Sequence, residues 1–281
     1  MRVKKLLFII FIIINLQLFA NFKYQPSNKE ELKELIRDES IYLGDIDTSA
    51  ITDMSFLFRS VNRSNFEGIE IWDVSNVKDM SHMFDRASEF NQDISNWDVS
   101  KVENMTTMFK RAIKFNQPIG KWNVGKVKNM SDMFVQAYNF NQDLSSWNVS
   151  NVKDMGGMFA SAIRFNQNLN SWDVSKVKSM YKMFLGSDSF NQPLDNWDVS
   201  NVKNFEFMFA GSSAFNQDLD KWKVGVKTKS LASKILEKIR IDYRPFCDMF
   251  GGSGMEKLPK WYMEIPSKLK TYPESAFRFM A

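Results

Sequence analysis

The sequence contains very little of the two residue types on which many metal and thiol sites depend. Among 281 residues there is one His, His82, and one Cys, Cys247. A zinc cluster of His and Cys ligands and a disulfide within the chain are therefore excluded. We expect Cys247 either to be buried or to form an intermolecular bond. The sequence predicts no cofactor, no metal site and no catalytic residues.

A strong excess of one charge is also missing once the first 20 residues are set aside. The chain has 37 Lys and Arg against 33 Asp and Glu, a net charge of +4. Residues 1–20 hold three basic residues and no acidic residue, which leaves 34 basic and 33 acidic residues after them. A balance so close to neutral argues against nucleic acid as the partner.

Residues 1–20 have the pattern of a secretory signal peptide. Arg2, Lys4 and Lys5 precede an apolar run from Leu6 to Phe19, and Ala20 offers a small residue for cleavage. The run is shorter than the about 20 apolar residues that span a bilayer. We therefore expect an exported protein, located at the cell surface, in the periplasm or in the medium, and held by a membrane only through an uncleaved signal segment.

The remaining chain is dominated by a repeat with a period of 25 residues. Seven tryptophans and six Phe-Asn-Gln triplets recur at this interval, which is typical of a stacked repeat protein. We predict a signal peptide at 1–20, an N-terminal capping helix at 21–44, the repeats at 45–226 and a C-terminal cap at 227–281. The repeats comprise one degenerate unit, six full units and one truncated unit.

Within a unit the spacing of apolar residues changes along the chain. Trp147 and Val149 alternate as in a short strand, whereas apolar residues in 155–162 recur at i, i+3, i+4 and i+7, as on a helix. This pattern predicts an α/β solenoid with short stacked parallel strands on a concave side and short helices on the other. Helical caps are expected at both ends, from a capping box at Ser27–Glu30 and from an amphipathic segment at Leu231–Ile239.

The unit from Leu144 to Phe165 resembles a known surface-protein repeat. Its spacing, L-x-x-W-x-V-S-x-V-x-x-M-x-x-M-F-x-x-A-x-x-F, is similar to the short W-D-V-S-N-V and M-x-x-M-F repeat of BspA-like leucine-rich-repeat bacterial surface proteins. The resemblance covers about Asp45 to Val226. It implies a leucine-rich-repeat-like fold and an extracytoplasmic protein in a family linked to adhesion and to binding of host proteins.

Two sets of equivalent residues are predicted to be structural. The tryptophans share the phase of core valines and are expected to pack in the core, although exposed stacked indoles would make a binding platform. The asparagines that follow a core Phe are expected to satisfy backbone groups in their own and the next unit. The tryptophans are Trp72, Trp97, Trp122, Trp147, Trp172, Trp197 and Trp222, and the asparagines are Asn91, Asn116, Asn141, Asn166, Asn191 and Asn216.

Two other sets form a candidate binding face. The residue after each Trp points away from the core, and its carboxylates either bind a cation such as Ca²⁺ or cap the adjacent turn. A basic set forms either a stripe for anionic glycans or acidic proteins, or a solvated surface. The first set is Asp73, Asp98, Asn123, Asn148, Asp173 and Asp198, and the second is Lys78, Lys128, Lys153, Lys178 and Lys203. Positions that vary between units, such as His82 and Asp132, are further candidates for specificity.

These observations predict a binding protein. We expect an exported, adhesin-like, monomeric repeat protein whose repeat face binds a protein or glycan partner, including extracellular proteins of a host. The alternative is a structural or antigenic envelope repeat protein without a single ligand. An enzyme is the least favoured class, because catalysis requires one constellation of unlike groups, and the polar residues here recur in repeating sets.

Overall fold

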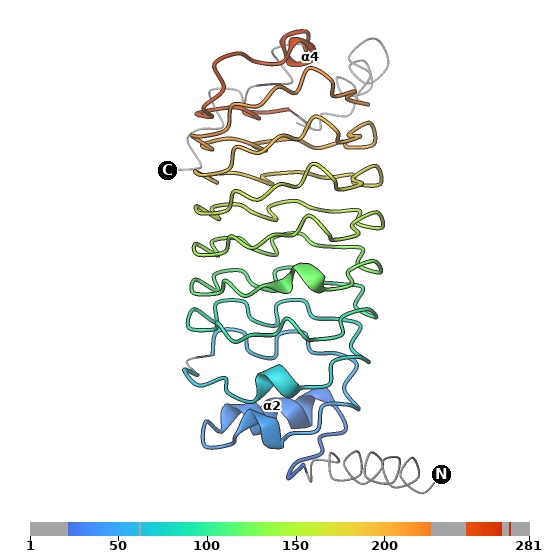
Figure 1. Cartoon of the computed structure of the whole chain (residues 1–281), viewed down its shortest axis with the longest axis vertical. Coiled ribbons are helices and arrows are strands. Elements are labelled where there is room, and N and C mark those ends of the chain that lie inside the picture. The colour runs from blue at the N-terminus through green and yellow to red at the C-terminus, as the bar shows by residue number, and fades with distance from the viewer. Residues whose placement is uncertain (1–21, 62, 226–245, 266–269, 271–281) are drawn as a thin grey trace, which may run out of the picture.

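A computed structural model of the protein describes residues 22–61, 63–225, 246–265 and 270. The chain winds into coils that stack in a straight column, with helix α2 at one end and helix α4 at the other (Figure 1). The helices are α2 (Lys29–Arg37) and α4 (Lys260–Met263), with the short 3₁₀ helices η1 (Leu43–Asp45), η2 (Ile69–Ile71) and η3 (Ile119–Lys121). The predicted signal peptide and the predicted helix at Leu231–Ile239 lie outside the described residues.

The prediction of stacked strands is wrong. Neighbouring coils are joined by isolated parallel bridges. The part of the chain that the structure describes contains no β-strand longer than such a bridge. The backbone N–H of Trp147 donates to the Leu144 carbonyl, and that of Val152 donates to the Val149 carbonyl. The chain therefore turns on both sides of the expected strand, and these groups are not available for a ladder. The bridges follow at Asp53, Asp79, Asn104, Asn129, Asp154, Ser179 and Asn204.

The prediction of a helix in each unit is also wrong. Over residues 155–162, odd-numbered residues donate their N–H groups to the following coil, and even-numbered residues from 158 onwards donate to the carbonyl three residues earlier. Gly157 and Ser161 have φ values of 65° and 55°. An α-helix requires i→i−4 bonds and negative φ throughout, so this segment is a series of turns. Such turns place apolar side chains at the same intervals as one face of a helix.

The loss of both elements overturns the leucine-rich-repeat-like architecture and its concave side. Curvature was expected because helices pack about 8 to 10 Å apart and strands about 4.8 Å. Here backbone hydrogen bonds join neighbouring coils at the bridges, along residues 155–161 and again from Lys114 to Ser88. Similar spacing around the coil makes the column straight (Figure 1).

Stacked rings and aliphatic side chains fill the interior. One Phe from each coil stacks on its equivalent with ring centroids 5.5 to 5.7 Å apart. Because each coil buries its apolar residues against both neighbours, a coil is stable only within the stack. This series comprises Phe58, Phe84, Phe109, Phe134, Phe159, Phe184, Phe209 and Phe250.

The prediction of helical caps at both ends is also wrong, because residues 246–265, part of the predicted C-terminal cap, form a further coil whose one helix, α4, has 4 residues. Phe246 stacks on Phe205, and Trp261 stacks on Trp222 with centroids 6.2 Å apart. The Trp261 Nε1–H donates to the Leu219 carbonyl at 2.8 Å, as the repeat tryptophans do in their coils. The signal for this coil is Phe246-x-x-Met249-Phe250, which repeats the spacing of the preceding unit.

The N-terminal end is covered by α2. Asn28 is its N-cap and accepts from the Glu31 N–H, while Glu31 Oε2 accepts from the Ser27 N–H at 2.7 Å. The capping box thus lies one residue later than expected, with Glu31 in place of Glu30.

None of the helices in the described ranges has the length and apolar character that a membrane span requires.

Candidate functional site

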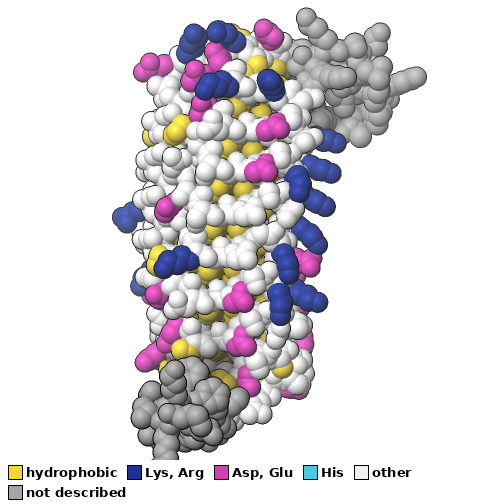
Figure 2. Space-filling view, turned by 45° about the vertical axis from the view of Figure 1, so that its right-hand side comes forward, with side chains coloured by type: hydrophobic (Ala, Val, Ile, Leu, Met, Phe, Trp, Pro, Cys, Tyr) yellow, Lys and Arg dark blue, Asp and Glu magenta, His cyan; other side chains and the backbone are white. Residues whose placement is uncertain are grey.

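The predicted basic residues lie in one line along the column. The Lys153 N–H donates to the Lys128 carbonyl at 2.8 Å, and the same bond joins Lys178 to Lys153 and Lys203 to Lys178. Lys78 lies on the same line, because the Glu103 N–H donates to the Lys78 carbonyl and the Lys128 N–H donates to the Glu103 carbonyl. Successive side chains therefore leave the backbone about 4.8 Å apart. Figure 2 shows Lys and Arg side chains gathered along one edge of the column.

A second basic column, which was not predicted from the sequence, runs beside the first. Lys101, Lys126 and Lys176 occupy the position two residues earlier in their coils. The Lys176 Nζ donates to Asn151 Oδ1 at 2.9 Å, which holds its charge over the preceding coil. We call the two columns together the basic strip: Lys78, Lys101, Lys126, Lys128, Lys153, Lys176, Lys178 and Lys203.

The middle of the basic strip is a shallow groove with a volume of about 410 Å³. Lys128 pairs there with Glu103 at 2.5 Å, and the hydrogen bond from Lys128 lowers the pKa of the Glu103 carboxyl. Lys126 and Lys153 have no carboxylate within ion-pair distance in the described part of the chain. The groove therefore carries a net positive charge. It is lined by Glu103, Lys126, Lys128, Asn151, Lys153 and Lys176.

The predicted acidic residues lie in a column beside the basic strip, with a gap at its middle (Figure 2). Each side chain accepts a hydrogen bond from the N–H two residues later, as Asp173 does from Ser175 at 3.0 Å. Hydrogen bonds from Ser175 lower the pKa of Asp173, and those from Ser100 and Ser200 lower the pKa values of Asp98 and Asp198. These side chains cap turns, as do Asp73, Asn123 and Asn148. The described residues contain no group of three His, Cys, Asp or Glu side chains that could hold a metal ion.

The seven repeat tryptophans lie in the interior. Each is only 3 or 4% exposed. Trp147 donates from Nε1 to the Ile119 carbonyl at 3.0 Å, and each of the others donates to the equivalent carbonyl in the preceding coil. The indoles therefore join coils through packing and hydrogen bonds, and they do not form an exposed binding platform.

The predicted asparagines form a chain of hydrogen bonds on the outside of the column. Asn141 Oδ1 accepts from the Asn166 N–H and from Gln167 Nε2, both at 2.9 Å. The Asn141 N–H in turn donates to Asn116 Oδ1. In the same way, the Oδ1 atoms of Asn91, Asn166 and Asn191 each accept from the backbone N–H of the equivalent asparagine in the next coil. Asn216 Oδ1 accepts from the Glu256 N–H. These side chains are exposed or half-buried, so the backbone groups that they satisfy lie close to solvent.

The variable position of each coil has a shared conformation. His82, Thr107, Asp132, Lys182 and Phe207 have φ values between 56° and 60°, in the left-handed region. Thr107 is buried, and burial raises the pKa of Asp132. Variation at this position is thus confined to one turn, at which side chains differ although the backbone does not.

One cluster on this side of the column departs from the repeat. Asp85 is buried, and its Oδ2 lies 3.1 Å from the Nε of Arg59 and 3.5 Å from the Nδ1 of His82. Phe56 stacks on the His82 ring with centroids 4.3 Å apart. The signal for this cluster was a carboxylate at a position that holds Lys110 or Val135 in the next coils. His82 Nδ1 and Asp85 Oδ1 have no hydrogen-bond partner within the described ranges.

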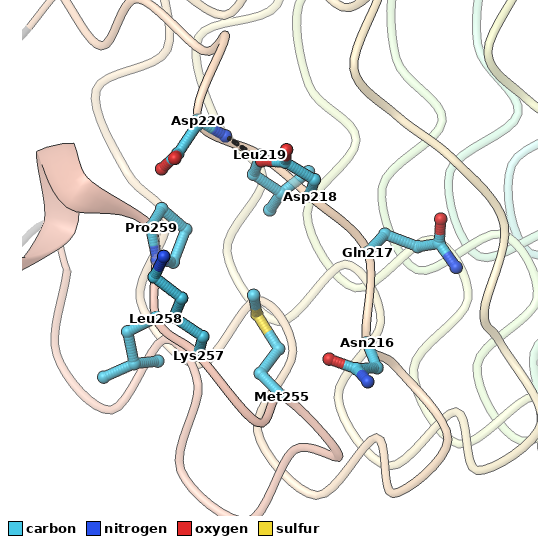
Figure 3. A pocket seen from close by; sticks show the side chains of 9 residues that line it. All are labelled: Asn216, Gln217, Asp218, Leu219, Asp220, Met255, Lys257, Leu258 and Pro259. Atoms are coloured by element: carbon cyan, nitrogen blue, oxygen red, sulfur yellow. Dashed lines mark hydrogen bonds between the residues drawn. The ribbon is translucent and has the colours of Figure 1, made fainter.

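A cavity of about 260 Å³ lies between the last full unit and the coil that follows it (Figure 3). Its two carboxylates are engaged: Asp218 Oδ1 accepts from the Asp220 N–H, and Asp220 pairs with Lys260 at 3.3 Å. The lining contains no His, Cys or Ser. The lining residues are Asn216, Gln217, Asp218, Leu219, Asp220, Met255, Lys257, Leu258 and Pro259.

Comparison with known proteins identifies one family. The family described as Mycoplasma protein of unknown function, DUF285, matches residues 30–147 and 138–238. No curated protein and no solved structure matches the chain. The two matches confirm the prediction of a repeat protein and leave the BspA-like family itself without support.

Proposed function

The chain belongs to the DUF285 family, and on that premise we propose that it is an exported surface or secreted repeat protein that binds a partner through the basic strip. The partner is a protein or a glycan outside the cell. The proposal of export rests on the basic and apolar pattern of residues 1–20.

The observation that carries the proposal is a set of like charges that the stack does not use. The repeat tryptophans and asparagines bond neighbouring coils, and the acidic column caps turns. Lys126, Lys153 and Lys178 are exposed and make no side-chain hydrogen bond or ion pair to the described residues. Three charges of the strip that make no such bond support electrostatic attraction of a partner.

Location is the first part of the proposal to test. Intact cells are treated with protease, and the protein is followed with an antibody against the repeats, with a cytoplasmic protein as the control. We expect the repeats to be degraded, or found in the medium, while the cytoplasmic protein stays intact. Protection of the repeats until the cells are lysed would contradict export.

Binding is the second part to test. The full chain is applied to host cells and to panels of immobilised extracellular proteins and glycans, together with a variant that replaces Lys126, Lys128, Lys153 and Lys178 by Gln. We expect the wild type to bind at least one of these surfaces and the variant to bind it at least tenfold more weakly. A variant that folds and binds like the wild type would contradict a role for the strip.

A further inference from the structure

We infer that the middle of the basic strip binds an extended acidic polysaccharide, one that carries sulfate or carboxylate groups along its length. This inference rests on the proposed function, because it names the partner of the same surface. The site is centred on Lys126, Lys128 and Lys153.

The charges beside the strip are what locate its centre. In sequence, Lys178 follows Asp173 by five residues, and Lys78 lies between Asp73 and Asp79. At Lys128 the equivalent neighbours are Asn123 and Asn129, and at Lys153 they are Asn148 and Asp154. Because amides replace carboxylates there, the acidic column has a gap at its middle (Figure 2), in the coils that also supply Lys126, Lys128 and Lys153 to the groove. Among the residues that line the groove, an anion therefore meets four ammonium groups and one carboxylate, that of Glu103.

The same amides can contact a sugar chain. Asn123 Oδ1 accepts from the Gly125 N–H, and Asn148 Oδ1 accepts from the Ser150 N–H. Their Nδ2 groups make no hydrogen bond to the described residues, and both side chains are exposed. Each Nδ2 can donate to a hydroxyl, sulfate or carboxylate oxygen. These neutral donors lie three residues before Lys126 and Asn151, which line the groove.

The shape of the strip suits an extended polymer. Lys128, Lys153, Lys178 and Lys203 follow one line, and three steps of about 4.8 Å give a row about 14 Å long at the backbone. Lysine stems are flexible, and an ammonium group accepts anions from many directions. A straight row of flexible cations therefore fits repeated negative groups better than it fits one small anion.

The composition of the groove argues against the two other classes of polyanion, acidic proteins and nucleic acids. Its lining contains no apolar or aromatic residue, and the large exposed hydrophobic residues, such as Ile71 and Ile113, are not part of it. Protein interfaces usually centre on buried aromatic or apolar anchors. Single-stranded nucleic acids bind by stacking of bases on aromatic rings. A hydrophilic polysaccharide needs neither.

The test uses dextran sulfate as the probe and uncharged dextran of equal length as its control. Binding to the full chain is measured by titration at several salt concentrations. We expect dextran sulfate to bind, with an affinity that falls as salt screens the charges, and dextran not to bind. The K126Q/K128Q/K153Q variant should bind roughly tenfold more weakly, because each exposed ion pair contributes a modest amount.

Two matched variants make the result specific. K121Q/K223Q/K257Q removes the same charge from exposed lysines outside the groove and should change the affinity less than twofold. N123D/N148D restores the carboxylates that other coils carry and should weaken binding severalfold, while thermal melts stay unchanged because Asp caps the same turn elsewhere. Equal effects of the two triple variants would overturn the site.

Polyglutamate and single-stranded DNA serve as competing probes. If either binds as tightly as dextran sulfate and depends equally on Lys126, Lys128 and Lys153, the assignment to a polysaccharide is wrong. If dextran sulfate does not bind while the full chain still attaches to host cells through the strip, this inference fails and the proposed function stands.

Discussion

The side chain of Asn141 joins two coils although it is exposed. Its Oδ1 accepts two hydrogen bonds from the next coil. Replacement by Ala leaves the Asn166 N–H to water and leaves Gln167 Nε2 only its bond to the Asn141 backbone carbonyl, so we expect Asn141→Ala to lower the free energy of unfolding by about 1 kcal/mol. Chemical denaturation measures the change. Asn139→Ala is the control, since the Asn139 side chain makes no hydrogen bond within the described ranges, and an equal loss there would contradict the role of Asn141.

Asp173 and the asparagines at the same position allow charge to be separated from capping. Asn123 and Asn148 cap their turns as Asp173 does, so we expect Asp173→Asn to change stability by less than about 0.5 kcal/mol. Asp173→Ala removes the acceptor for the Ser175 N–H and should cost about 1 kcal/mol. Thermal melts of the two variants compare these effects. A large loss with Asn would show that the carboxylate itself is required.

The acidic column also predicts how stability responds to acid. Hydrogen bonds from serines lower the pKa values of Asp98, Asp173 and Asp198 in the folded protein. Their contribution to stability is therefore present above the unfolded value of about 3.9 and is lost as pH falls through the lower folded values. A variant with Asn at all three positions should lose less stability between about pH 5 and pH 2. An unchanged dependence on pH would contradict this assignment.

At the scale of the coil, the period could be predicted and the backbone conformation could not. The interval of 25 residues indicated which side chains stack. Apolar residues at 155–162 match a helix, but consecutive turns produce the same intervals, and hydrogen bonds to the next coil decide between them. The left-handed backbone conformation of His82 and Phe207 could not be predicted from the sequence, because glycine is the residue that usually adopts it.

The site shows a similar division between what could and could not be predicted. The line of Lys128 and Lys153 followed directly from the period. The second column, with Lys126 and Lys176, was missed because lysines and asparagines alternate irregularly there. The groove depends on a turn that brings the two columns and Asn151 together, and a spacing pattern does not specify that turn.

The attachment of α2 depends on Arg63, which is buried. Its guanidinium donates to the carbonyls of Ile36, Ile41 and Asn65 from three different nitrogens. A lysine has one nitrogen and cannot reach all three. We expect Arg63→Lys to lower stability by about 1 to 3 kcal/mol and to increase amide hydrogen exchange in α2. Arg37→Lys, at an exposed position, is the control, and an equal effect would argue against this anchoring.

For the whole molecule, the continuous core predicts that damage in one coil spreads to its neighbours. Trp147 packs between two coils and donates to the Ile119 carbonyl. We expect Trp147→Ala to cost about 3 to 5 kcal/mol and to lower the melting temperature of the entire column. Ile163→Ala, at a residue that is 38% exposed, should change stability far less. A Trp147→Ala protein that melts like the wild type would contradict a shared core.

The uniform step between coils has a consequence for the length of the gene. Each coil offers the same donors and acceptors to the coil before and after it, from the tryptophan bonds to the chain of asparagines. Loss or duplication of 75 nucleotides in frame therefore joins equivalent residues and keeps every stack continuous, whereas a change of one codon more or fewer would shift all of them. Recombination between repeats can thus lengthen or shorten the column, and with it the number of lysines presented, without redesign of either end.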